Sequence, residues 1–296
     1  SQTDYIGRVL ERFNMQSAKA ASTPLPINLR LSSGPEGEDM KSVPYAPAIG
    51  SLMYAMVATR PDISHAVGRQ QIHAQPRLIA LERIKHVFRY LAGTKDHDIL
   101  FGPNSTSGIV SYTDSDFAGC MDTASNLEVN NRNYFKFGNG VISWKSKLQE
   151  CTTTSTTEAE YVAASDATKE ALSLGRLAHT FRQVNSDSAL VVYSNSQGVI
   201  ALSKNPVHHN ASKHIDVRYH FIRDCVISGK IGLEEISTTD NVAHGMTKCL
   251  SADRFRSLRH QMGVTKIGPI KVGHTAQDGF GPPTSVLLGS ASALPT

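Results

Sequence analysis

The sequence predicts an α/β fold in which a small helical module precedes a mixed sheet flanked by helices. Two observations support this prediction. Apolar residues recur at helical spacing in the first part of the chain, whereas strand-like alternation begins after Gly108. Three strand-like segments then come in a row and are followed by helix, strand, helix, strand and helix. This order is typical of a mixed sheet covered by helices.

Length and composition are those of a globular protein. The 296 residues suffice for about two domains of ~150 residues each, and a 40% hydrophobic content can fill a core. The net charge of +4 permits a polyanionic partner without requiring one. The 4 cysteines have no C-x-x-C spacing, and no apolar run approaches the ~18 residues of a membrane span. We therefore expect an intracellular protein, cytoplasmic or nuclear, with no membrane partner, disulfide framework or zinc site.

The first part of the chain predicts helices. Ile6 and Leu10 belong to an apolar stripe at helical spacing over residues 4–15. Arg60-Pro61-Asp62 starts a later helix, and Gly93 closes the apolar stripe of the next one. The predicted segments are a helix within residues 1–19, a Pro- and Gly-rich linker at 20–44, and a helical module at 45–104.

The second part of the chain predicts the sheet. Gly138-Asn139-Gly140 separates two of the strand-like runs and indicates a hairpin. Ser155 and Glu158 fit a capping box at the start of the strongest helix. Residues 264–296 are rich in glycine and proline and predict a disordered tail. The predicted strands are 109–113, 134–137, 141–144, 189–193 and 231–236.

Two acidic residues are candidates for a functional site on pattern alone. Asp114 follows the first strand, and open α/β sheets place functional groups at the carboxyl ends of strands. Glu160 lies three residues before Ala163 and therefore shares the apolar face of its helix. A carboxylate aimed at a core is costly unless it is paired, hydrogen-bonded or bound to a metal. The pattern leaves open a solvated helix N-terminus, where acids favour the helix dipole.

Several longer motifs occur in a characteristic order: VPYAPAIGSLMYAMV (43–57), RYLAGT (89–94), YTDSDFAG (112–119), ISWKSKLQ (142–149), STTEAEYVAAS (155–165), YSNSQGVIALSKNP (193–206) and KHIDVRYHFIR (213–223). With them the chain resembles the C-terminal part of the Pol polyprotein of copia-type LTR retrotransposons. The resemblance implies a thumb-like helix within 1–19, a connection-like module at 45–104 and an RNase H-like domain at 108–263. Because the polymerase's aspartate motif belongs upstream in this family, we expect no reverse transcriptase active site in the chain.

The resemblance also implies a site. RNase H-type nucleases cut the RNA strand of an RNA·DNA hybrid, with four acids that hold two Mg²⁺ ions at the scissile phosphate. Residue by residue, the first two acids match Asp114 and Glu160. Asn195 and His244 stand where the family has aspartates. Asn195 offers one neutral carbonyl oxygen, and the imidazole of His244 suits transition metals better than Mg²⁺. We therefore expect Mg²⁺ binding, as the ancestral cofactor, to be weak or lost.

Other polar residues are candidates for secondary roles. Asp116 and Asp240 lie nearby in the sequence and are alternative metal ligands. The residues of KHIDVRYH, His214, Asp216, Arg218 and His220, either contact a nucleic-acid backbone or form a structural network beside their helix. Basic side chains position a duplex through its phosphates without reading sequence. Those predicted to do so are Lys145, Lys147, Lys213 and Arg218.

The sequence leaves three functions open. The first is a Pol fragment whose RNase H-fold domain descends from a hybrid-cutting nuclease with a now degenerate, inactive site. The second is a non-catalytic module that binds an RNA·DNA hybrid or another nucleic acid through basic side chains. The third is a pseudogene product without a selected role. The expected partners are nucleic acid and the rest of a Pol polyprotein.

Overall fold

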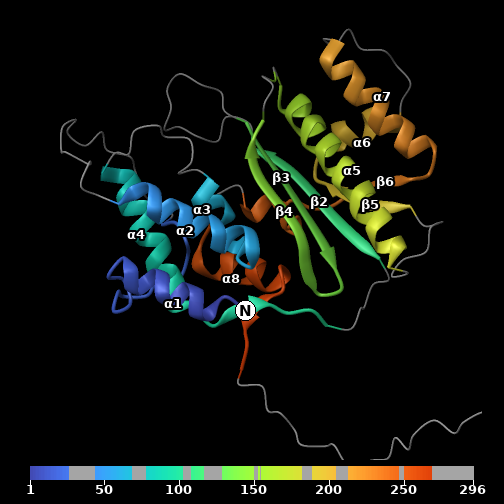
Figure 1. Cartoon of the computed structure of the whole chain (residues 1–296). Helices are drawn as coiled ribbons and strands as arrows, with labels where there is room; N and C mark the ends of the chain where they lie inside the picture. Colours follow the sequence, from blue (N-terminus) through green and yellow to red (C-terminus); the bar gives the residue numbers. More distant parts are fainter. Residues whose placement is uncertain are drawn as a thin grey trace, which may run out of the picture.

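The computed structural model describes residues 1–26, 44–68, 78–102, 108–116, 129–149, 153, 155–181, 189–204, 213–246 and 250–268. Within these ranges a group of helices lies on one side of a five-stranded sheet, and a second group of helices covers its other side (Figure 1). No helix in the described ranges is both long and apolar enough to cross a membrane.

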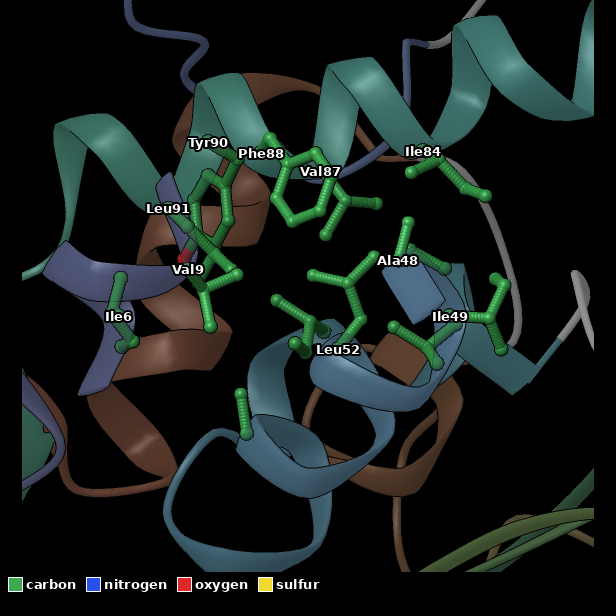
Figure 2. Packing of buried hydrophobic residues seen from close by; sticks show 14 of the residues in the cluster. Ile6, Val9, Ala48, Ile49, Leu52, Ile84, Val87, Phe88, Tyr90 and Leu91 are labelled. Atoms are coloured by element: carbon green, nitrogen blue, oxygen red, sulfur yellow. The ribbon is translucent and has the colours of Figure 1, made fainter. Parts of the chain in front are cut away.

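The helices on the N-terminal side share one apolar core. Side chains from several helices converge in it, among them Ile6, Leu52 and Phe88 (Figure 2). The first helix ends at Arg12, earlier than the predicted residue 15, because Asn14 adopts a left-handed φ of 55°. The elements are α1 (Thr3–Arg12), α2 (Tyr45–Ala58), the 3-10 helix η2 (Pro61–Ile63), α3 (Ser64–Gly68) and α4 (Leu78–Gly93).

A buried ion pair joins η2 to α4. The Arg60 guanidinium donates to both carboxylate oxygens of Asp62, at 2.9 and 2.8 Å, and both side chains are fully buried. Arg60 also donates to the carbonyl oxygen of Thr94 at 2.9 Å, and the Tyr90 hydroxyl donates to Asp62 Oδ2 at 2.6 Å. Every charge in this group has a close partner, which offsets the cost of removing it from water.

The C-terminal part of the described chain packs back on these helices. Phe255 of α8 (Ala252–Gln261) belongs to their core, and Arg259 donates to the Tyr90 hydroxyl at 3.1 Å. Strand β7 (Val264–Lys266) pairs with β1 (His97–Ile99). The predicted RNase H-like domain, 108–263, therefore includes a helix that packs on the helical module. Likewise, residues 264–266 form a strand where the disordered tail was predicted to start; 269–296 lie outside the described residues.

A close backbone approach lies between α8 and β7. Gly263 has a φ of +75°, and a Cβ there would come within 2.6 Å of the carbonyl oxygen of Asn139. The amide of Leu100 donates to the Gly263 carbonyl oxygen at 2.8 Å. Only glycine fits this position without strain, because the turn at Asn139 and Gly140 lies directly against it.

The sheet has the order β4-β3-β2-β5-β6. β2 pairs antiparallel with β3 and parallel with β5, while β3–β4 is antiparallel and β5–β6 parallel. The predicted mixed sheet is thus confirmed, as is the hairpin at Gly138-Asn139-Gly140, although β3 begins earlier than residue 134. The strands are β2 (Ile109–Asp116), β3 (Asn130–Phe137), β4 (Gly140–Leu148), β5 (Leu190–Ser194) and β6 (Ile231–Glu235).

Each face of the sheet has its own core, and adjacent residues of β3 serve opposite faces. Phe135 packs with three helices, of which α5 presents a stripe of small residues that includes Ala164 and Ala167. Ser155 caps α5 as predicted, since its hydroxyl accepts from the Glu158 amide at 3.2 Å. The helices on this face are α5 (Thr156–Thr180), α6 (Gln197–Lys204) and α7 (Lys213–Ile227).

The opposite face carries aromatic side chains. Tyr134 is fully buried, and Tyr112 and Trp144 pack against the same cluster. The indole of Trp144 donates to the carbonyl oxygen of Met56 at 3.1 Å and so joins β4 to α2. These three aromatic residues therefore belong to the core on this face. A short 3-10 helix, η3 (Ala243–Met246), packs on this face over β2 and β3.

Candidate functional site

Asp114 lies near the carboxyl end of β2 and is 2% exposed. The neighbouring strand β5 runs parallel, with Thr113 opposite Ser194. Asp114 and Asn195 each come directly after one of these two paired residues. They therefore lie at the same edge of the sheet. This is the edge at which open α/β sheets place functional side chains.

His244 of η3 contacts Asp114 directly. Its Nδ1 atom lies 3.1 Å from Asp114 Oδ2, and the two side chains are 22% and 3% exposed. The residues are 130 positions apart in the sequence. The fold thus brings together two of the residues that the sequence predicts for the site.

Glu160 lies in the first turns of α5 and faces the same edge of the sheet. Burial raises the pKa of its carboxyl to about 8, and the negative charge of Asp114 adds to that shift. Interaction with Ser115 opposes the shift, and the charge of Asp116 adds to it. Within the described residues its buried Oε2 atom has no hydrogen-bond partner. Glu160 is therefore not a solvated first-turn acid but a carboxyl held beside Asp114.

Asn195 presents its amide at the end of β5. Its Nδ2 atom donates to the Thr238 hydroxyl at 3.3 Å. Its Oδ1 atom is buried and has no hydrogen-bond partner in the described part of the chain. A carbonyl oxygen without a hydrogen-bond partner is available as a ligand for a hard cation.

The two alternative acids differ in their placement. Asp116, the last residue of β2, is half-buried and close enough to Glu160 to affect its pKa. Asp240 is exposed and accepts from the Ser237 hydroxyl at 2.7 Å in a turn before η3. Among the described residues no group of three or more His, Cys, Asp or Glu is placed to hold a metal ion.

The predicted phosphate-contacting residues lie on two elements. Lys145 and Lys147 are exposed on β4, with Lys145 Nζ 3.9 Å from Asp166 Oδ2. Arg218 is half-buried on α7. The side chains of Lys213, His214 and Asp216 lie outside the described residues.

Three polar residues that the sequence does not predict, Asn131, Gln149 and Asp166, hold α5 against the sheet. The amide of Asn131 donates to Asp166 Oδ2 at 3.3 Å, which joins β3 to α5. The side-chain amide of Gln149 donates to the Ala159 carbonyl oxygen at 2.8 Å and also to Asn131 Oδ1. These bonds fix the first turns of α5, and with them Glu160, against the sheet. No sequence spacing distinguishes such amides from surface residues.

Comparison with known proteins gives close relatives for most of the chain. It is 44% identical over 271 residues to the retrovirus-related Pol polyprotein from transposon TNT 1-94 of Nicotiana tabacum, covering 89% of this chain and 20% of the relative. It is 37% identical over 273 residues to the corresponding polyprotein from transposon RE1 of Arabidopsis thaliana, covering 91% of this chain and 18% of the relative. The chain thus spans about a fifth of these relatives.

Among solved structures, an RNase H1 isolated from compost (LC11-RNase H1) is 14% identical, with a TM-score of 0.36 over 48% of this chain and 93% of that one. The chain matches no protein-family model. The sequence similarity extends over about 90% of the chain and concerns Pol polyproteins of one kind. Over about 90% of its length the chain is homologous to a segment of the retrovirus-related Pol polyproteins of copia-type transposons.

Proposed function

We propose that the chain is the RNase H-like segment of a copia-type Pol polyprotein whose hydrolytic site is degenerate. The contact between His244 Nδ1 and Asp114 Oδ2, at 3.1 Å, carries this proposal. A ligand oxygen that a divalent ion needs is engaged by an imidazole, and the imidazole replaces an aspartate of the related nucleases. Cleavage of the RNA strand in an RNA·DNA hybrid is therefore the ancestral reaction and not the present one.

Charge supports the proposal. Two Mg²⁺ ions so close together repel each other strongly, and several carboxylates must offset their charge. Here Asp114 and Glu160 remain, and a Glu160 pKa of about 8 favours its neutral form near pH 7. Asn195 adds a carbonyl oxygen without charge. This set of ligands carries too little negative charge to fit a pair of Mg²⁺ ions.

A cleavage assay tests the proposal. We expect no Mg²⁺- or Mn²⁺-dependent cleavage of a labelled RNA·DNA hybrid by the natural chain, and cleavage by the double variant Asn195→Asp/His244→Asp. Adding Asp114→Ala to that variant must abolish the recovered activity. Efficient cleavage by the natural chain that depends on Asp114 would refute the proposal.

A second candidate function is binding of an RNA·DNA hybrid or duplex without cleavage. It is favoured by the two exposed lysines that β4 carries two residues apart, Lys145 and Lys147, and so on one side of the strand. Binding of this kind weakens steeply with salt because counterions are released.

Titration of the chain with an RNA·DNA hybrid at several salt concentrations tests the second function. Lys145→Ala/Lys147→Ala should weaken binding equally for different sequences and reduce the salt slope by about 1 for each lysine. Lys85→Ala is the matched control, because Lys85 on α4 has a similar side-chain exposure, 48% against 51% for Lys145. Binding that is insensitive to salt, or equally reduced in the control, would contradict it.

A further inference from the structure

Asn241 is fully buried in the segment that leads from β6 to η3, and both ends of its side-chain amide are bonded. Its Nδ2 atom donates to the carbonyl oxygen of Thr113 at 3.0 Å. Its Oδ1 atom accepts from the amide of Ala243 at 3.0 Å. One side chain therefore connects the backbone of β2 to the start of η3.

The two backbone points that Asn241 joins adjoin the two residues of the site. Thr113 directly precedes Asp114, and Ala243 directly precedes His244. In addition, the His244 amide donates to the Asn241 carbonyl oxygen at 3.1 Å. The distance between residue 244 and Asp114 thus depends on a short bridge through Asn241.

We propose that Asn241 is a positioning residue, which holds residue 244 over Asp114 whichever side chain residue 244 carries. In the natural chain it places the His244 imidazole on Asp114; in a chain with aspartate at 244 it would place that carboxylate as a metal ligand. The inference deepens the proposed function and rests on it for the second of these roles only.

Apolar packing holds η3 independently of this bridge. Val242 and Ala243 are buried in the cluster that contains Tyr134, on the face of the sheet opposite α5. Loss of the amide should therefore shift η3 locally while the sheet stays folded. This separates a positioning role from a purely structural one.

The first test is the spectrum of the His244 imidazole in the full chain. Its side-chain ¹⁵N signals, assigned by their loss in His244→Gln, should show a hydrogen-bonded Nδ1 in the natural protein. Asn241→Ala should shift them to those of a solvent-exposed histidine, while circular dichroism stays unchanged. Thr239→Ala, an exposed change in the same loop, is the control and should leave the signals in place.

A second variant keeps the test decisive if Asn241→Ala does not fold. Asn241→Asp retains an oxygen for the Ala243 amide but has no donor for the Thr113 carbonyl oxygen. It should also displace the His244 signals. Unchanged signals in a folded variant of either kind would overturn the inference.

The second test uses Mn²⁺ alone as the probe, titrated by electron paramagnetic resonance. In the His244→Asp background, adding Asn241→Ala should weaken Mn²⁺ binding by about 10-fold or more, the usual effect of losing a residue that orients a ligand. Equal affinity with and without Asn241 would overturn the inference. If His244→Asp alone binds no Mn²⁺, the histidine spectrum decides the positioning role by itself, and cleavage by the double variant Asn195→Asp/His244→Asp still tests the proposed function separately.

Discussion

At the Glu160 carboxyl, burial and the neighbouring charge of Asp114 act in the same direction and raise its pKa from 4.5 to about 8. The folded state therefore holds a proton that the unfolded state releases between these two values. Stability is then greatest at the acidic end of this window and falls as the pH rises through it, because the native carboxyl must ionise in a buried place.

We predict that Glu160→Gln removes this pH dependence. The variant should unfold with a free energy that changes little between about pH 5 and about pH 8, and its advantage over the natural chain should grow as the pH rises. Urea unfolding in metal-free buffer at several pH values measures this. Glu82→Gln, at an exposed position, controls for the loss of one carboxylate. A natural chain whose stability increases toward pH 8 would contradict the raised pKa of Glu160.

The buried pair of Arg60 and Asp62 gives a second prediction. Asp62→Ala leaves a guanidinium without its carboxylate in a dry core and should cost about 3–5 kcal/mol of unfolding free energy. Glu82→Ala breaks the exposed pair with Lys85 and should cost at most about 0.5 kcal/mol. Urea midpoints at a constant slope measure both. Similar losses of unfolding free energy in the two variants would show that burial does not determine how much an ion pair contributes to stability.

The residues of the site differ in how far the sequence predicts them. The apolar face of α5 predicts that Glu160 points inward, because the spacing of three residues between Glu160 and Ala163 is contained within the helix itself. The contact between Asp114 and His244 joins residues 130 positions apart and depends on the placement of η3 by Asn241. No local pattern encodes such a contact, so only the resemblance to a family placed these residues together.

At the scale of elements, the ends of helices and hairpins are set by short-range chemistry. Ser155 accepts from the Glu158 amide and so satisfies a donor that the first turn of α5 leaves open. We predict that Ser155→Ala costs about 1 kcal/mol of unfolding free energy. Ser173→Ala, the same change in the interior of α5, is the control and should cost less, since its hydroxyl donates to the Lys169 carbonyl oxygen, which is not a helix-capping bond. Equal losses in urea unfolding would contradict a capping role.

For the same reason the sequence predicted the α5 cap and the β3–β4 turn correctly, whereas it did not predict where α8 packs. The apolar residues of α8, Phe255 and Leu258, are compatible with packing on any neighbouring surface. Their placement follows from contacts with Tyr90, on a helix far away in the sequence, and from the pairing of β7 with β1. Long-range packing of this kind has no signature within the segment itself.

At the scale of the whole molecule, the segment of α8 and β7 joins the two halves. Phe255 completes the core of the N-terminal helices, while Met262 and Val264 complete the core on one face of the sheet. The two cores therefore depend on the same short segment. Their stabilities should be coupled.

We predict that a chain ending at residue 249 loses protection from hydrogen exchange in both α4 and β3. A chain ending at residue 268 keeps all the described elements and should match the full chain. Hydrogen exchange followed by mass spectrometry measures the protection of peptides from each element. Full protection of α4 in the shorter chain would show that the helices are stable on their own.

The docking of α8 also has a consequence for synthesis. The hydroxyl of Tyr90 and the ring face that Phe255 covers are completed only by residues that the ribosome adds much later. Until then, the helices of the nascent chain present an unfinished apolar surface. The helices that precede the sheet are thus synthesised before α8 but reach their final packing only after α8 has been added.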